Sequence, residues 1–497
     1  MQSPPIRQQP IPSSSKTQTY DLTDWQQGYS SQTQELDCWL TAVEGEIPRQ
    51  LQGTLFRNGP GLFEIGEVPI RHPFDGDGLI TAFTFTGDGR VHFRNRFVRT
   101  DGYVQEQAAK KMLYRGVFGT QPPGSWWKNA FDLRLKNIAN TNVVYWGEKL
   151  LALWEAAHPY RLDPLTLETL GLENLDGILQ TGDTFSAHPC IDPHCDQDEG
   201  QACLVNFALK TGVSSQITLF ELSPTGELLR RHHHKIPGFA FIHDFAITPN
   251  YAIFLQNKVT FNPLPYLFGF KGAGECVQFQ PSQPARIILI PRNPPYDQVK
   301  ILAVEAGFVF HHANAFEADH KIYLDSICYA SLPQIQPDTF YKDVNFENLD
   351  PGQLWRFSID LDSESVERQL LLARCCEFPT LNSDRVGRSY RYVYLGAAHH
   401  DTGNAPLQAV VKLDLETGAE KIYSVAPRGF TGEPIFVANP EGISEDDGWL
   451  LILVYNAATH RSELVILEAQ TLTFLAMISL PIHIPYGLHG SWTNHRF

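Results

Sequence analysis

The chain has 497 residues, of which 43% are hydrophobic, 12% aromatic and 19% charged. Its formal net charge is −16, which excludes a basic surface for nucleic acid or anionic lipid. No apolar run approaches the ~18 residues that span a membrane. Eight cysteines without a CxxC pair favour a reduced, cytoplasmic protein over a disulfide scaffold.

The N-terminal segment is rich in proline, glutamine and serine and lacks the apolar stretch of a signal peptide. Such a composition cannot bury enough apolar surface to fold. We therefore predict a disordered leader over residues 1–19 and one domain over residues 20–497.

Short apolar or alternating runs separated by turn residues dominate the rest of the chain, and long helical patterns are scarce. One pattern recurs: a strand ends at a turn, and a second strand returns. These turns fall at Asp88, Asp163, Ser223, Arg292, Asp360, Asp414 and Glu468. Seven hairpins at blade-like intervals predict an all-β fold, a seven-bladed β-propeller. Separate β-sandwiches are disfavoured, because no linker composition interrupts residues 50–495.

Two intervals between hairpins are longer than the others, at about 100–150 and 325–350. We expect helical and loop insertions there, laid as a dome across one face of the propeller.

Histidines are the candidate functional residues, and the chain has eighteen. The triplet at 232–234 lies between cationic residues and is expected to be a solvated edge. A smaller set lies in apolar, strand-like contexts: His188, His243, His489, and either His311 or His312 in "FVFHHANAFE". Strand alternation places His311 and His312 on opposite faces but does not choose between them.

Inner strands of a propeller converge on its axis, so imidazoles from four blades could meet there. Four neutral imidazoles suit iron, zinc, copper or nickel. Glu155, Glu377 and Glu433 stand in apolar surroundings and could accept the distal ring N–H groups. Their charge would offset that of a buried metal ion.

Eight motifs along the chain resemble those of the carotenoid cleavage oxygenase family, with the cyanobacterial apocarotenoid-cleaving oxygenases as the nearest branch. They are "LQGTLFRNGPG", "HPFDGDG", "LLALWEA", "FAFIHDFAIT", "FVFHHANAFE", "CCEFP", "GEPIFV" and "PYGLHGSW". The resemblance follows family order from about Asp21 to Trp492.

The resemblance implies one non-haem Fe(II) per chain, held on the axis by His188, His243, His311 and His489. His312 then becomes a packing residue inside the blade. Glu155, Glu377 and Glu433 would support three of the histidines, and Thr141 would lie close to an open metal position.

The implied reaction is O2-dependent cleavage of the central 15,15' double bond of apocarotenals or apocarotenols, giving retinal and a shorter aldehyde. No catalytic residue beyond the metal centre is expected. The alternatives are an oxygenase of stilbenes or full-length carotenoids, a polyene isomerase, or a propeller that serves as an interaction scaffold.

A long apolar polyene needs an aromatic tunnel, with Phe74, Trp154, Phe241 and Phe310 as candidate wall residues. Phe310 is the weakest candidate, because alternation places it opposite His311 unless the strand bends. A membrane-dipping patch is expected from Phe118, Trp126, Trp127, Phe131, Leu264, Tyr266, Leu267 and Phe268. We expect a cytoplasmic monomer associated peripherally with membranes, and no nucleic-acid partner.

Overall fold

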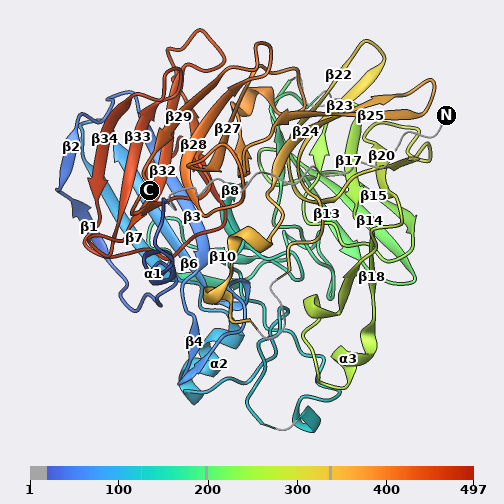
Figure 1. Ribbon diagram of the computed structural model, residues 1–497, viewed down its shortest axis with the longest axis horizontal. Coiled ribbons are helices and arrows are strands. Elements are labelled where there is room, and N and C mark those ends of the chain that lie inside the picture. Colours follow the sequence, from blue (N-terminus) through green and yellow to red (C-terminus); the bar gives the residue numbers. More distant parts are fainter. Residues whose placement is uncertain (1–18, 125, 196–199, 335–338) are drawn as a thin grey trace.

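The computed structural model describes residues 19–124, 126–195, 200–334 and 339–497. The predicted leader therefore lies outside the described residues, apart from residue 19. The rest of the chain forms seven antiparallel sheets arranged as the blades of a propeller, so the predicted fold class is confirmed (Figure 1). Among the described residues, no helix is both long and apolar enough to cross a bilayer.

Each blade runs from an innermost strand at the axis to an outermost strand at the rim. From the axis outward, blade 1 contains β35 (Gly490–Thr493), β3 (Gln52–Pro60), β6 (Gly78–Thr86), β7 (Val91–Phe97) and β1 (Asp37–Leu40). Blade 2 contains β8 (Asn142–Trp146), β9 (Lys149–Leu153), β10 (Tyr160–Leu162) and β11 (Thr169–Leu172). Blade 3 contains β12 (Cys190–Asp192), β13 (Cys203–Lys210), β14 (Ser214–Leu222) and β15 (Leu228–Pro237).

Blade 4 contains β16 (Ala246–Ile247), β17 (Tyr251–Gln256), β20 (Ala285–Pro291) and β21 (Lys300–Val304). Blade 5 contains β22 (Phe308–Ala318), β23 (Lys321–Tyr329), β24 (Gln353–Asp360) and β25 (Ser365–Leu372). Blade 6 contains β26 (Cys376–Thr380), β27 (Tyr392–Ala398), β28 (Leu407–Asp414) and β29 (Glu420–Ser424). In blade 7, both β30 (Gly429–Phe430) and β31 (Ile435–Ala438) pair with β32 (Gly448–Asn456), followed by β33 (Arg461–Glu468), β34 (Phe474–Ser479) and β2 (Val43–Gly45).

The ring is closed twice by strands from opposite ends of the chain. The C-terminal β35 pairs with β3 in blade 1, and the N-terminal β2 pairs with β34 in blade 7. A buried cluster that includes Leu55, Phe83 and Trp449 packs between these two blades. Closure therefore removes the free edges that an open array of blades would expose.

The seven predicted turn residues lie at or just after the end of the third strand in each blade. Several are explained by turn chemistry. The side-chain Oδ1 atoms of Asp163, Asp360 and Asp414 each accept the backbone N–H two residues ahead, at 2.8, 3.1 and 3.0 Å. This local bond favours a tight reversal of the chain.

The outer strand of blade 3 corrects one expectation. His232 and His234 are each only 8% exposed, and their ring nitrogens lie 2.6 Å apart. His233 is exposed. Because alternate side chains of β15 face inward, the predicted solvated edge is wrong for His232 and His234.

Irregular segments cover one end of the propeller, and we call residues 98–124, 126–141, 262–276, 330–334 and 339–352 the cover. It contains α2 (Asp101–Ala109) and α3 (Pro263–Leu267), whereas α1 (Leu22–Gln27) precedes blade 1. Two small hairpins lie nearby, β4 (Glu64–Ile65) with β5 (Val68–Pro69) and β18 (Val259–Phe261) with β19 (Val277–Phe279). In Figure 1, α2, β4 and α3 extend together below the blades. Single 3-10 turns occur at Pro73–Asp75, Trp126–Lys128, Gly274–Cys276, Tyr341–Asp343, Phe346–Asn348 and Ser383–Arg385.

The predicted insertions at about 100–150 and 325–350 are displaced at one boundary each, because β8 and the end of β23 belong to blades. The segment around α3 was predicted as part of a membrane patch but not as an insertion of the dome. A buried ion triad fixes part of the cover: Lys136 Nζ lies 2.6 Å from carboxylate oxygens of both Asp77 and Glu106. Removing Lys136 would leave two buried carboxylates without a counter-charge.

Candidate metal centre

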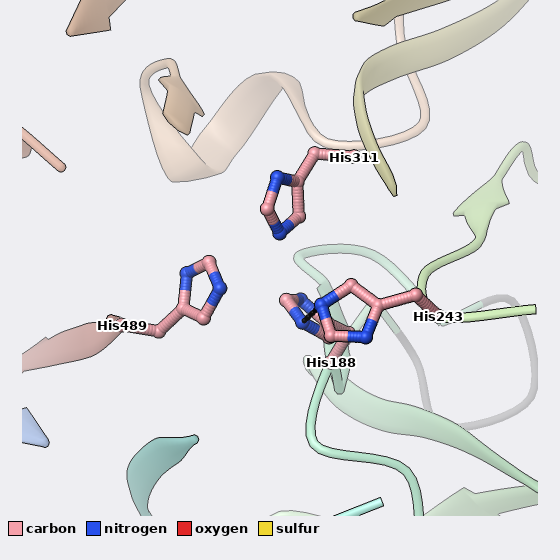
Figure 2. Close-up of side chains that lie close together, drawn as sticks. All are labelled: His188, His243, His311 and His489. Atoms are coloured by element: carbon pink, nitrogen blue, oxygen red, sulfur yellow. Dashed lines mark hydrogen bonds between the residues drawn. The ribbon is translucent and has the colours of Figure 1, made fainter. Parts of the chain in front are cut away.

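The four predicted histidines come together at one end of the propeller axis. His188, His243 and His489 lie just before the innermost strands β12, β16 and β35, and His311 lies near the start of the innermost strand β22. One ring nitrogen from each histidine lies within 4.8 Å of the others. Figure 2 shows the four rings turned toward a common point. The chain enters each of these blades on the axis, which is why residues distant in sequence meet there.

Three of the histidines are held by carboxylates from other blades. The Nδ1 atoms of His243, His311 and His489 lie 2.7, 2.6 and 2.9 Å from carboxylate oxygens. Their respective partners are Glu155, Glu377 and Glu433. Because an ionised carboxylate only accepts, each Nδ1 carries the proton and each Nε2 presents its lone pair.

His188 is held differently. Its Nδ1 lies 3.8 Å from Asp244 Oδ1, which is too long for a hydrogen bond. Its Nε2 lies 2.9 Å from the Nε2 of His243.

The donor set fits a metal ion. His311 Nε2 is buried and has no hydrogen-bond partner, although buried polar atoms are nearly always paired. A metal ion bound among the ring nitrogens would satisfy it.

Burial and the neighbouring carboxylates together set the protonation of the ligands. Burial lowers the pKa of His311, but the adjacent Glu377 outweighs it, so that the pKa of His311 is raised. Burial, followed by the neighbouring imidazoles, lowers the pKa of His188 well below its usual value. Burial also lowers the pKa of His489 to about 4, against the opposing effect of Glu433. Burial opposes ionisation of Glu377, but the adjacent His311 lowers the pKa of that carboxyl. Neutral rings beside ionised carboxylates are the state that a metal ligand requires.

The "FVFHHANAFE" strand does not alternate regularly. The pairing of β22 with β23 shifts register between Val309 and His312 and again before Asn314. His312 Nδ1 hydrogen-bonds Ser326 Oγ at 2.7 Å within the blade. Phe310 nevertheless lines the same cavity as His311. The expectation from alternation that Phe310 faces away is wrong, because the β-bulge bends the strand at this point.

An apolar cavity of about 410 Å3 begins at His243, His311 and His489. All four aromatic residues predicted for a tunnel wall line it: Phe74, Trp154, Phe241 and Phe310. Thr141, only 7% exposed, also lines it. Tyr29, Phe346 and Tyr486 were missed as wall residues; the only sequence signal was that Tyr486 belongs to the "PYGLHGSW" motif.

A smaller cavity of about 140 Å3 continues from it beneath the cover. The two share His72, Phe74, Phe118, Phe241, Phe310 and Pro333 in their walls. The smaller cavity reaches Gly274, Glu275 and Val277. We treat the pair as one continuous apolar cavity.

A larger space of about 1290 Å3 lies on the other side of the histidines, along the propeller axis. It is lined by the innermost strands and by His188, His311, His312 and His489. Its wall extends to exposed residues such as Glu148 and Asp384. We call it the axial funnel. His311 and His489 line both the funnel and the apolar cavity, and the sequence did not predict this second access.

Five residues of the predicted membrane patch are exposed: Trp126, Trp127, Phe131, Leu264 and Phe268. Leu133, Leu135 and Phe270 are also exposed and were missed. The ring centroids of Phe131 and Phe268 lie 5.6 Å apart, and those of Trp126 and Phe270 lie 5.1 Å apart. The segments 126–135 and 264–270 therefore form one surface, which we call the apolar patch.

Three residues predicted for that patch are not fully exposed. Tyr266 and Leu267 are half-buried, and the Arg115 guanidinium lies over the Tyr266 ring. The prediction that Phe118 belongs to the membrane patch is wrong, because Phe118 is half-buried. Its ring stacks on His72 at 4.8 Å and lines the apolar cavity, because the loop that carries it folds inward. Asp75 accepts two backbone N–H groups of this loop, from Phe118 and Thr120.

Comparisons with known proteins agree with this architecture. The sequence profile of the family described as "Retinal pigment epithelial membrane protein" matches residues 29–494. The chain belongs to this family. The match to this oxygenase family confirms the resemblance predicted from the sequence motifs.

Two relatives illustrate the range of proteins to which the chain is similar. The chain is 62% identical to the apocarotenoid-15,15'-oxygenase of Synechocystis sp., over 98% of this chain and 99% of that protein. It is 31% identical to resveratrol cleavage oxygenase 1 of Aspergillus fumigatus, over 91% of this chain and 92% of that protein. The crystal structure of cobalt-substituted Synechocystis ACO superimposes with a TM-score of 0.95, covering 96% of this chain and 100% of that one, at 62% identity.

Proposed function

We propose that the protein is an iron(II) oxygenase that cleaves the central 15,15' double bond of apocarotenals or apocarotenols. The products are retinal and a shorter aldehyde. The observation that carries the proposal is the convergence of four imidazoles at the inner end of an apolar, aromatic cavity. The 62% identical relative, which is named for this reaction, supports the choice of substrate.

His188, His243, His311 and His489 would hold one iron per chain. When bound, iron(II) supplies redox activation of O2, which zinc does not. In the overall reaction, the C=C bond breaks and each of its two carbons receives one oxygen atom of O2.

The chain's own residues bind and position the polyene. Phe74, Trp154, Phe241 and Phe310 offer an apolar wall that excludes water and orients the substrate along the cavity. Thr141 would lie close to a bound metal ion, because it lines the cavity next to His489, whose backbone N–H donates to the Thr141 carbonyl at 3.1 Å. No general acid, general base or nucleophile is assigned, since the three nearby glutamates are engaged by the histidine rings.

The apolar patch would rest on a membrane surface, from which the substrate enters. Its segment 264–270 leads directly into Gly274, Glu275 and Val277 at the end of the apolar cavity. Docking would be hydrophobic rather than electrostatic, in line with the net charge of −16. One chain supplies all four ligands, so the metal site needs no second subunit. We further propose a cytoplasmic monomer that binds membranes peripherally.

Cleavage of stilbenes is the second candidate, favoured by the relative named resveratrol cleavage oxygenase. The deciding experiment incubates iron-loaded protein with a C30 apocarotenal, a full-length carotenoid and resveratrol. We expect retinal from the apocarotenal and the fastest turnover with it. Preferential cleavage of resveratrol would support the second candidate instead, and isomerised polyene without aldehyde would indicate an isomerase.

Metal analysis separates the enzyme from an interaction scaffold. We expect about one iron per chain, as for a four-ligand site in a single chain. Protein without bound iron and without activity after Fe(II) addition would contradict the enzyme proposal.

A further inference from the structure

The axial funnel carries charge of only one sign. Its wall contains the carboxylates of Glu148, Asp244, Asp384, Glu433 and Glu441. No lysine or arginine is among its lining residues in the described part of the chain. A cleft lined by one sign of charge raises the local concentration of the opposite ion and speeds its association.

These carboxylates occupy two levels of the funnel. Glu148, Asp384 and Glu441 are exposed and lie at its outer end. Asp244 and Glu433 lie at its inner end: Asp244 is 3.8 Å from His188, and Glu433 holds His489. Acidic side chains therefore lie both at the mouth of the funnel and beside the ligands, where Glu433 is also paired with Arg57.

The funnel ends on an unsatisfied ring nitrogen. His311 Nε2 has no hydrogen-bond partner, the residue is only 9% exposed, and it lines the funnel. An unpartnered imidazole nitrogen at the end of a carboxylate-lined path favours a metal cation as the species that moves along the funnel. Water or a neutral solute would not require the carboxylates.

The apolar cavity offers a poorer route for a hydrated dication. Phe74, Trp154, Phe241 and Phe310 line it near the histidines, and Phe118 lines its continuation. Glu155, Asp350 and Glu377 also line this cavity, but Glu155 and Glu377 are already hydrogen-bonded to histidines of the ligand set. The cationic Arg57 lies in the same wall, and a divalent ion that moves along the aromatic stretch loses hydration.

We propose that the axial funnel is the route by which a divalent metal ion reaches the four histidines, with Glu148, Asp384 and Glu441 attracting it at the mouth. The polyene and the metal ion thus enter from opposite sides of the ligand set. This inference rests on the proposed function, in which the four histidines hold the metal.

The test measures the rate at which full-length metal-free protein takes up Co(II), followed by its visible absorption. The funnel variant combines Glu148→Gln, Asp384→Asn and Glu441→Gln. The matched control combines Glu347→Gln, Glu367→Gln and Asp401→Asn, three exposed carboxylates that do not line the funnel. Both variants change the net charge equally.

We expect the funnel variant to load about tenfold more slowly than the unmodified protein at low ionic strength. The control should differ by less than about twofold, and the difference should vanish near 1 M salt, where exposed charges are screened. The final amount of bound Co(II) should be the same in all three proteins. Equal slowing in both variants, or no slowing in either, would overturn the proposal.

A second measurement repeats the loading with an apocarotenal bound in the apolar cavity. We expect an unchanged rate, whereas a tenfold decrease would place metal entry in the apolar cavity and overturn the proposal. Failure of Co(II) to bind at all, or binding that persists after loss of His489, would refute the metal centre itself. Normal final binding without a rate difference would refute the entry route alone.

Discussion

The apolar cavity and the axial funnel meet at the same histidines but differ in chemistry. Aromatic side chains from the cover and the blade ends form much of the first, whereas the innermost strands and acidic residues of the adjoining turns line the second. His311 and His489 belong to both walls. The difference shows how a propeller axis can expose a single ligand set to an apolar substrate on one side and to solvent on the other.

Loss of a histidine that lines both cavities should have the largest effect on metal content and activity. In the variant His489→Ala, we expect metal content to fall below about one-tenth of an ion per chain, since one of four ligands is lost. Product formation should be lost with it. Elemental analysis and a retinal assay measure the two effects.

The variant His312→Ala is the matched control. Its ring hydrogen-bonds Ser326 inside blade 5, so metal content should stay near that of the unmodified protein. Iron retained in His489→Ala would contradict the assignment of His489 as a ligand, and iron lost in His312→Ala would reopen the choice between His311 and His312.

The carboxylate beneath a ligand should matter less than the ligand. Glu377→Gln removes the negative charge of the carboxylate that accepts the hydrogen bond from His311 Nδ1. We expect metal affinity to fall about 10- to 100-fold. Competition with a chelator measures it. Tyr329→Phe removes the 2.9 Å hydroxyl bond to the same carboxylate, and we expect less than about a threefold change. Equal effects would show that the charge of Glu377 is not what supports the ligand.

A substitution in the wall of the apolar cavity should lower substrate turnover without changing metal binding. Phe310→Ala removes an aromatic side chain from the apolar cavity, worth about 1.5–3 kcal/mol of buried contact. We expect kcat/KM for an apocarotenal to fall about 10- to 100-fold, with metal content unchanged. Phe270→Ala, at an exposed aromatic outside the cavity, should leave kcat/KM in detergent unaltered. A loss of metal in Phe310→Ala would mean that the two sides are coupled.

The smallest effect concerns the apolar patch at the outer side of the cover. The double variant Trp127→Glu with Phe131→Glu should weaken binding to neutral lipid vesicles about tenfold, while kcat/KM in detergent stays the same. Trp39→Glu is the control, because Trp39 is 47% exposed on the outer strand of blade 1, away from the cover. Vesicle sedimentation measures binding, and equal loss in both variants would contradict a membrane-facing patch.

Much of the site could be predicted from the sequence because its residues stand in local motifs. The hairpin turns at Asp163, Asp360 and Asp414 are made by side chains bonding to their own backbone, so their spacing was sufficient to predict blades. Periodicity alone left His311 and His312 undecided, and the resemblance to a known family chose His311. The geometry then places His311 among the other three histidines.

Only the tertiary structure decided which surfaces these residues share. Strand alternation failed for Phe310 because a bulge shifts the register of β22, and Phe118 turned from the surface into the cavity wall because its loop folds onto His72. The axial funnel brings together carboxylates from residues 148 to 441, which no local pattern connects. The sequence by itself determined the repeating hairpins and the motifs that supply ligands, since these depend on neighbouring residues. The access routes depend on how seven blades and a cover pack around an axis, and that packing joins residues hundreds of positions apart.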